Sequence, residues 1–305
     1  MPELPEVETI ARGVDARVRG DRIVEAWFGS HSEPFKTPAA QQARALEGRV
    51  FLAVHRTGKH IVCELGPRET EAAVKSHARG KRSETRQIDA GKIDAGQIEA
   101  QQPDAQWIVH LGMTGRLLMS ASGAPPEPHT HARLTLASGR ELRFVDPRRF
   151  GRLEFRHLAR AEAFQAPGAE PLSIPGEAFA ALFRGRRLPI KSALLNQKLL
   201  AGVGNIYADE SLFRAGIRPR RQAGRLTRAE LERLRDALRK VLRHAIRLGG
   251  SSVSDYVDAD GERGFFQLEH HVYLRTGQPC RVCGTPIQRI LLGGRGTHFC
   301  PRCQH

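Results

Sequence analysis

Four cysteines near the C-terminus constrain the fold of this chain more than any other feature. Cys280 and Cys283 form one Cys-x-x-Cys pair, and Cys300 and Cys303 form a second pair after sixteen intervening residues. Two pairs at this spacing are typical of a tetrahedral zinc site with four thiolate ligands, with chance clustering or a redox pair as the alternatives. Because no coordination position is left for water, we expect one structural zinc ion that stabilises a segment too short for its own core. Catalysis must then be sought elsewhere in the chain.

The chain is strongly basic. Its 48 Lys and Arg residues exceed its 33 Asp and Glu residues, which gives a net charge of +15. Such an excess favours a polyanionic partner, and nucleic acid is the first candidate. The alternative is that a GC-rich genome raises the arginine content of all its proteins, so that the charge has no functional meaning. No run approaches the roughly 18 apolar residues of a membrane span, and the acidic terminus lacks the features of a secretory signal. We therefore expect a cytoplasmic protein without membrane association.

Hydrophobic periodicity divides the chain into distinct parts. Residues 5–19 repeat apolar positions at helical spacing, whereas short apolar runs from residue 22 to 155 indicate antiparallel β structure. The polar, repetitive stretch 66–106 interrupts that pattern and is expected to be a disordered loop between two strands. A Pro- and Gly-rich break at 166–175 precedes helical patterns, including the capping box of Thr227 and Glu230. These changes predict a domain boundary near that break.

The N-terminus offers a nucleophile. Removal of Met1 would leave Pro2 with a secondary amine, which at an α-amine pKa near 7.7 to 8 is partly neutral at physiological pH. Attack on the anomeric carbon of a sugar would form an iminium that permits elimination of the neighbouring phosphate. Glu3, adjacent in sequence, could transfer the protons, as could Glu6, one turn further, and Lys59, at an apparent hairpin tip. A proline at this position is nonetheless common without any catalytic role.

Five sequence blocks stand out along the chain: Pro2–Thr9, His110–Gly115, Asp146–Gly151, Gly202–Ala208 and the four-cysteine finger. These blocks resemble those of bacterial formamidopyrimidine-DNA glycosylase. They occur in the order of that family and span nearly the whole chain outside residues 66–106. The resemblance implies a bifunctional base-excision enzyme that removes 8-oxoguanine and formamidopyrimidines and then cleaves the abasic strand by β and δ elimination.

The resemblance also implies a role for each catalytic position. Pro2 matches the Schiff-base nucleophile, and Glu3 matches the general acid that opens the sugar ring. Lys59 matches the proton donor of β elimination. Arg295 matches the finger arginine that grips the target phosphate and donates a proton in δ elimination.

Further positions match DNA contacts of the family. Met113, Arg148 and Phe150 match the side chains that fill the space left by an extruded base, although Met113 and Phe150 read alone would be core residues. Asn205 is expected to cap a helix that begins at Ile206. Residues 251–271 match a loop that closes over the base. The remaining matches are His129, Lys191 and Arg186, where the family commonly has lysine.

Two alternatives stay open at this point. A sister endonuclease VIII-like glycosylase acts on oxidised pyrimidines, but its opening usually reads Pro-Glu-Gly-Pro-Glu, whereas this chain has Leu4. A noncatalytic DNA-damage-binding protein would be expected to lose part of the catalytic set. We predict an α+β monomer that associates with the bacterial nucleoid and binds double-stranded DNA containing oxidised bases or abasic sites. Its predicted parts are a β-sandwich flanked by helices (1–165), a linker (166–175), a helix-two-turns-helix domain (176–265) and a zinc-ribbon finger (266–305).

Overall fold

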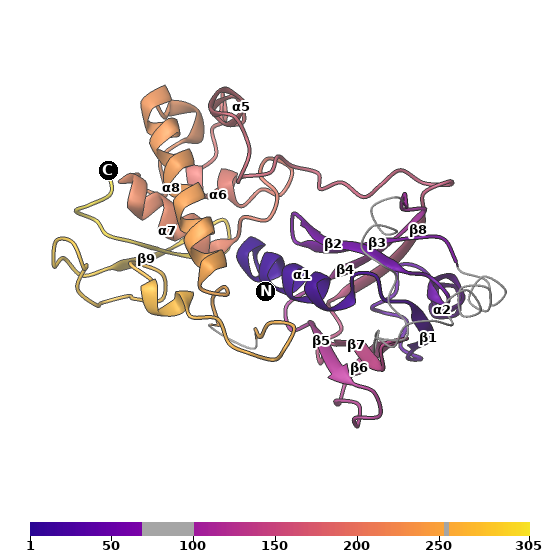
Figure 1. Ribbon diagram of the computed structural model, residues 1–305. Coiled ribbons are helices and arrows are strands. Elements are labelled where there is room, and N and C mark those ends of the chain that lie inside the picture. Colours follow the sequence, from indigo (N-terminus) through magenta and orange to yellow (C-terminus); the bar gives the residue numbers. More distant parts are fainter. Residues whose placement is uncertain (69–100, 253–255) are drawn as a thin grey trace, which may run out of the picture.

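The computed structural model describes residues 1–68, 101–252 and 256–305. Strands dominate the N-terminal half, whereas helices and a two-stranded hairpin make up the C-terminal half (Figure 1). This arrangement confirms the predicted combination of an antiparallel β-sandwich, a helical part and a C-terminal finger. The boundaries proposed for these parts stay predictions. Within the described residues, no helix is long and apolar enough to cross a membrane.

The sandwich consists of two four-stranded antiparallel sheets. Its core is formed by the inward-facing side chains of both sheets, such as Trp107, Leu134 and Phe144. The first sheet has the order β1 (Ile23–Phe28), β6 (Thr130–Leu136), β7 (Arg140–Val145), β5 (Arg116–Ala121). The second has the order β2 (Phe51–Thr57), β3 (His60–Leu65), β4 (Ala105–His110), β8 (Arg152–His157).

Two helices accompany the sandwich, α1 (Leu4–Val18) and α2 (Ala39–Leu46). From Val7 to Val18 the buried side of α1 belongs to the sandwich core, but Leu4 belongs to the core of the helical half. The first turn of α1 therefore lies where the two halves meet, which places the N-terminus of the chain between them.

The predicted insertion lies between β3 and β4. These strands pair in register, with Leu65 opposite Ala105. The interpretation of residues 66–106 as disordered falls largely on 69–100, which are outside the described residues. Its last two residues, Ala105 and Gln106, are buried in β4, so the prediction extended too far into the strand.

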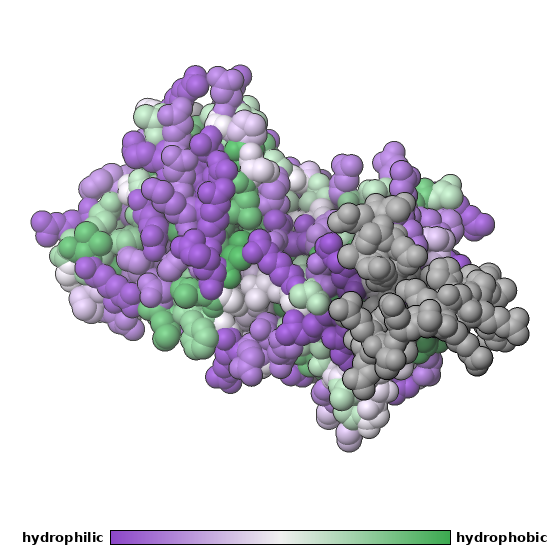
Figure 2. All heavy atoms as spheres, in the orientation of Figure 1, coloured by the Kyte–Doolittle hydropathy of each residue, from purple (hydrophilic) through white to green (hydrophobic). Residues whose placement is uncertain are grey.

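The helical half is built around α7 (Asn205–Ala215) and α8 (Arg228–Arg247), with the short helices α5 (Gly176–Ala181) and α6 (Ile190–Leu194) beside them. The predicted capping box is present, since the Glu230 N–H donates to Thr227 Oγ1 at 3.3 Å. Leucines and alanines along one side of α8 are buried, while the face toward the viewer is mostly hydrophilic (Figure 2).

The finger is formed by the hairpin of β9 (Gln288–Leu292) and β10 (Arg295–Phe299) with the cysteine turns. Its small core combines Ile287 and Val272 with Phe213 of α7, and β10 packs directly against α7. Helix α7 is therefore held between α8 and the finger hairpin.

Candidate active site between the two halves

A cavity of about 410 Å³ opens where the halves meet. Pro2, Glu3, Lys59, Asn205 and Arg295 all line it, although they come from the segment before α1, the β2–β3 turn, α7 and the finger. Met113, from the loop after β4, also reaches this cavity. The fold thus brings the four predicted catalytic residues together from positions almost three hundred residues apart.

Glu3 is buried and accepts hydrogen bonds at the start of α7. The N–H groups of Ile206 and Tyr207 donate to its two carboxylate oxygens, at 3.1 and 3.5 Å. Burial raises the pKa of Glu3 to about 7; Lys59 opposes this rise, Glu6 adds to it and the backbone donors oppose it. Much of this carboxyl group therefore carries its proton at neutral pH, as a proton donor requires.

The prediction that Asn205 caps this helix is wrong. The N-cap position is Gly204, and Asn205 is the first residue of α7. Its side-chain amide instead donates to the Gly296 carbonyl of the finger at 3.0 Å. A Cβ on Gly204 would lie 2.1 Å from Cδ of Glu3, so only glycine leaves space for the carboxyl group that replaces a local cap.

Lys59 lies in the tight turn between β2 and β3, next to Gly58 with φ +63°. Its side chain is buried, and burial lowers the pKa of Lys59, although the nearby Glu3 and Glu6 oppose that effect. A lysine with a lowered pKa can exchange a proton near neutral pH more readily than an exposed one.

Glu6 connects the N-terminus to Ser251, which lines the cavity. It accepts hydrogen bonds from the Glu3 N–H at 2.8 Å, the Ser251 N–H at 2.8 Å and the Tyr207 hydroxyl. Burial raises the pKa of Glu6 as well. Sequence reasoning considered Glu6 only as a further proton donor, one turn after Glu3. Of the predicted closing loop, residues 253–255 are outside the described part, while Ser251 and Tyr256 line the cavity.

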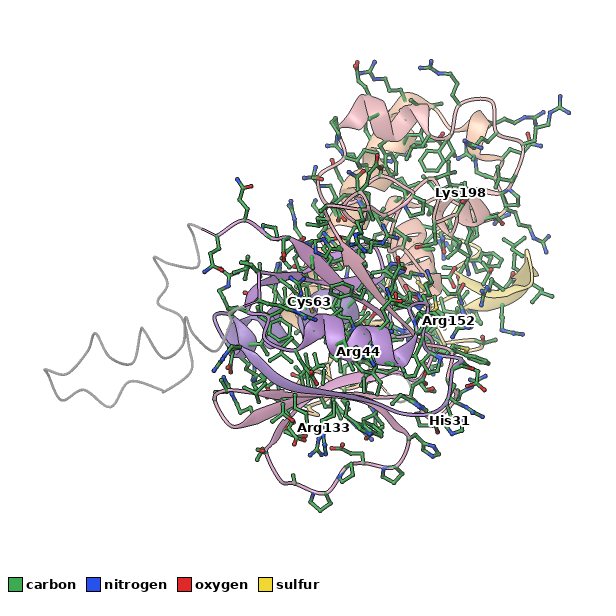
Figure 3. The ribbon with its side chains drawn as sticks, turned by 90° about the vertical axis from the view of Figure 1, so that its right-hand side faces the viewer. His31, Arg44, Cys63, Arg133, Arg152 and Lys198 are labelled. Carbon is green, nitrogen blue, oxygen red and sulfur yellow. The ribbon has the colours of Figure 1, made fainter. Side chains whose placement is uncertain are left out.

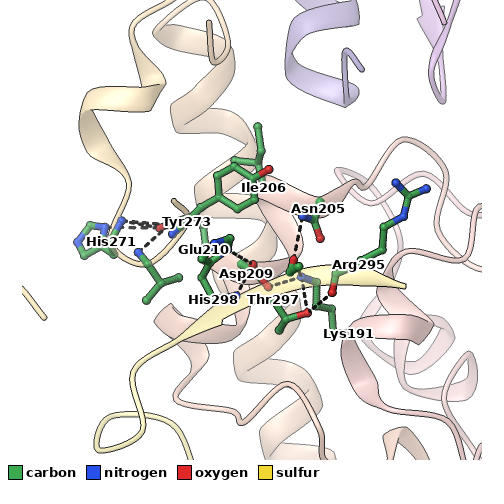
Figure 4. Close-up of polar contacts among 12 residues, drawn as sticks. Lys191, Asn205, Ile206, Asp209, Glu210, His271, Tyr273, Arg295, Thr297 and His298 are labelled. Atoms are coloured by element: carbon green, nitrogen blue, oxygen red, sulfur yellow. Dashed lines mark hydrogen bonds and ion pairs between the residues drawn. The ribbon is translucent and has the colours of Figure 1, made fainter. Parts of the chain in front are cut away.

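Arg295 is exposed at the tip of the finger hairpin, after Gly293 and Gly294 with positive φ. The backbone of the hairpin is held from below by Lys191, whose Nζ donates to Gly296 O and Thr297 Oγ1, both at 2.9 Å (Figure 4).

Lys191 is fully buried and forms an ion pair with Asp209 at 2.7 Å. Asp209 also accepts a hydrogen bond from the His298 N–H at 2.9 Å. The ammonium thus faces three protein oxygens, from Gly296, Thr297 and Asp209. The structure places Lys191 beneath the hairpin and not on a surface open to DNA.

The predicted space-filling residues project from two neighbouring loops. Met113 and Phe150 are 43% and 48% exposed, so neither is a core residue, and the guanidinium of Arg148 lies 4.9 Å from the ring centre of Phe150. Asp146 joins the loops by accepting hydrogen bonds from Thr114 Oγ1 at 2.6 Å and from the backbone N–H of residue 151 at 2.7 Å. The two loops that carry the exposed trio are therefore joined through one buried carboxylate.

His129 and Arg186 do not line the cavity. Exposed His129, with φ +68°, contributes to a separate depression beside His31, and exposed Arg186 donates from Nε to the Leu182 carbonyl at 2.6 Å. Figure 3 labels His31 and Arg152 in the N-terminal half and Lys198 in the helical half.

The four cysteines meet the geometric requirement for zinc. Their sulfur atoms all lie within 4.8 Å of one another. The Sγ separations are 3.4 Å for Cys283 and Cys300 and 3.9 Å for Cys280 and Cys303. A tetrahedral ion with Zn–S bonds of about 2.3 Å needs sulfur atoms about 3.8 Å apart. The four cysteines therefore hold one structural zinc ion, as predicted.

Comparisons with known proteins cover the whole chain. Three family models match: the formamidopyrimidine-DNA glycosylase N-terminal domain (residues 1–153), its H2TH domain (167–257) and a zinc finger found in FPG and IleRS (277–305). The formamidopyrimidine-DNA glycosylase of Solibacter usitatus is 43% identical and that of Gluconobacter oxydans 42%, with at least 99% of each chain covered.

Solved structures agree with these matches. Lactococcus lactis Fpg in a complex with DNA containing an abasic site has a TM-score of 0.78 and 30% identity, over 99% of both chains. A mutant of the same protein bound to Fapy-dG-containing DNA gives 0.79 and 31%, over 100% of both chains. The fold and the cavity thus define a DNA glycosylase of the helix-two-turns-helix class with a zinc finger. Within that class, the chain belongs to the formamidopyrimidine-DNA glycosylase family.

Proposed function

We propose that this protein removes oxidised purines from duplex DNA and then cleaves the abasic strand, with its N-terminal proline as nucleophile. The observation that carries the proposal is the convergence of Pro2, Glu3, Lys59 and Arg295 on one cavity. The glycosylase and lyase activities belong to the family as a whole. The assignment of each step to a residue of this chain is our inference from position and chemistry.

Base removal begins at Pro2. After Met1 is cleaved off, the Pro2 nitrogen attacks C1′ of the deoxyribose, and the glycosidic bond breaks with its electron pair leaving on the base. The departing base takes up the proton that the Pro2 nitrogen loses. Glu3, protonated because of its raised pKa, gives its proton to the ring oxygen as the C1′–O4′ bond opens. The product is an iminium that joins the sugar to the protein.

Strand cleavage follows from the acidity of the carbon next to the iminium. The Glu3 carboxylate, which has already given up its proton, accepts a proton from C2′. The C3′–O bond then breaks with its electron pair on the 3′ phosphate, and Lys59 donates a proton to that phosphate in this β elimination. A second elimination expels the 5′ phosphate, with Arg295 binding that group and donating the proton. The exposed guanidinium at the hairpin tip is suited to a phosphate, because it presents several N–H donors in one plane.

The lesion must leave the base stack before it can enter the cavity. We assign Met113 and Phe150 to fill the vacated space and Arg148 to bind the orphaned partner base, because all three are exposed on neighbouring loops. His129, Arg186 and Asn205 are proposed to contact the DNA backbone. Such contacts fix the position of the duplex without reading its sequence. The activity is expected in the cytoplasm, at the nucleoid where the substrate lies.

Lys191 is proposed as a positioning residue and not a direct DNA contact. Its ammonium holds Gly296 and Thr297 in place, one and two residues after Arg295, and Asp209 compensates its charge. A fixed hairpin backbone would direct Arg295 toward the cavity. The zinc ion, when bound, supplies only the folding energy of this segment.

Borohydride trapping on duplexes containing 8-oxoguanine opposite cytosine tests the proposal. Fully processed protein, verified by intact mass, should form a cross-link that peptide mapping places on residue 2. Pro2→Ala should slow the reaction at least 100-fold, whereas Pro5→Ala, at the neighbouring proline, should cross-link as the wild type does. A cross-link that persists in the Pro2 variant and maps to Lys59 would overturn the assignment. Faster cleavage of thymine-glycol duplexes would favour the endonuclease VIII-like alternative.

A further inference from the structure

The outer face of α8 carries a group of cations that the proposed chemistry does not use. Arg214 of α7 and Lys240, Arg243, His244 and Arg247 of α8 line a depression of about 300 Å³. All except His244 are exposed. We refer to these five residues as the α8 patch.

The charges of the patch are not compensated within the protein. In the first half of α8, Arg228 pairs with Glu232 and Arg235 with Asp236, both at 3.2 Å. From residue 237 to 247 the helix contains no acidic residue. Within the described part of the chain, no carboxylate lies within ion-pair distance of the patch, and Arg247 has only the ring nitrogen of His244 at 3.2 Å. Cations crowded in this way repel one another until an anion binds.

The α8 patch lies away from the catalytic cavity. Its residues do not line that cavity, and α7 separates α8 from the finger hairpin. Asn205, at the first residue of α7, faces the cavity, whereas Arg214 lies nine residues further, about 14 Å along the helix. In Figure 1, α8 is in front of α7 and β9, and Figure 2 shows the hydrophilic surface over it. The α8 patch therefore shares no lining residue with the catalytic cavity.

The arrangement of the patch fits a phosphate backbone better than a protein. Lys240, Arg243, His244 and Arg247 follow the spacing of one helix face and extend about 10 Å, a length that spans roughly three phosphates of one strand. No apolar or aromatic side chain lines the depression, although protein interfaces depend on such anchors. A surface of cations alone binds nucleic acid without sequence preference.

We propose that the α8 patch binds the backbone of a second DNA segment while the first occupies the cavity. The chain would then bridge two duplexes, and an undamaged segment held at α8 could replace the segment in the cavity during the search for lesions. The occupancy of the cavity by DNA rests on the proposed function, but the patch itself does not.

The test compares two variants of the same helix with equal loss of charge. Arg243→Gln/Arg247→Gln removes patch cations, whereas the control Arg228→Gln/Arg235→Gln removes cations that are paired with carboxylates. Each protein is first trapped with borohydride on a short lesion duplex, and the complex is then titrated with a labelled undamaged duplex by fluorescence anisotropy. A failure to trap would count against the proposed function, and the patch would then be tested by the stoichiometry of undamaged duplex on free protein.

We expect the wild-type and control complexes to bind the second duplex, and the patch variant to bind it at least tenfold more weakly. In the patch variant, the slope of the logarithm of the association constant for the second duplex against the logarithm of the salt concentration should decrease in magnitude by about 2. Each lost phosphate contact contributes about 0.9 to this slope. Excision on the short duplex should be unchanged in both variants, which verifies folding. The proposal is wrong if the patch variant and the control variant bind the second duplex equally tightly. It is also wrong if the wild-type protein binds only one duplex and its α8 patch binds polyglutamate, an acidic peptide, instead.

Discussion

The buried carboxyl group of Glu3 makes a measurable prediction about stability. Its pKa rises from 4.5 to about 7 in the folded protein, mainly because of burial. Between these pH values the native state holds a proton that the unfolded chain releases, so stability falls as pH rises. At 1.36 kcal/mol per pH unit, the full penalty above pH 7 is about 3 kcal/mol, and about 2.5 kcal/mol of it develops between pH 5 and pH 8.

Glu3→Gln should remove this penalty. The free energy of unfolding of the variant should rise by about 2.5 kcal/mol relative to that of the wild type as pH increases from 5 to 8. The altered hydrogen bonds add a cost that does not depend on pH and therefore does not affect this difference. Urea unfolding followed by the fluorescence of buried Trp107 would measure the difference. Glu232→Gln, the same substitution at an exposed position on α8, serves as the control for the general effect of replacing a glutamate by glutamine. A difference between Glu3→Gln and wild type that stays constant from pH 5 to 8 would refute the reasoning.

Three further predictions follow from the contacts around the site. Chelation of zinc should reduce duplex cleavage at least 100-fold while the Trp107 unfolding transition persists, and unchanged cleavage after verified metal loss would contradict the structural role. Lys191→Met should still bind one zinc ion and form the borohydride cross-link, but the ratio of β-elimination to δ-elimination products should rise about tenfold. Lys191→Arg should restore the wild-type ratio. An unaltered ratio in Lys191→Met would exclude the positioning role. The side chain of Arg56 is 5% exposed and forms ion pairs with Glu8 and Glu170. Arg56→Met should lower the free energy of unfolding, measured in urea, by about 3 kcal/mol. A loss below about 1 kcal/mol would count against a structural role for these two ion pairs.

Features determined by local sequence could be predicted well. The cysteine spacing identified the zinc ligands, the capping box identified the start of α8, and the apparent hairpin tip located Lys59 between two strands. Each of these signals arises from residues within one element or one hairpin. The physical rules of capping, periodicity and turn geometry therefore apply to them directly.

Long-range contacts could not be predicted in the same way. Sequence rules look for a helix cap beside the helix, which is why Asn205 was chosen, whereas the acceptor is Glu3, about two hundred residues earlier. Lys191 resembles a DNA contact by charge, but its burial depends on the finger folding over α6. No local pattern reveals that Glu6 joins three distant segments, although its place one turn after Glu3 was a hint.

The hydrogen bonds between Glu3 and the start of α7 make the acid sensitive to how the two halves are arranged. Any swing that separates them would pull the carboxyl group from the helix end and admit water, and the group would then ionise as an ordinary surface glutamate does. In a complex in which the halves cannot come together, Glu3 would be an ionised carboxylate without a proton to donate, and the sugar ring would stay closed. The protonation of the catalytic acid is in this way coupled to the closed arrangement of the two halves, and no separate regulatory element is needed.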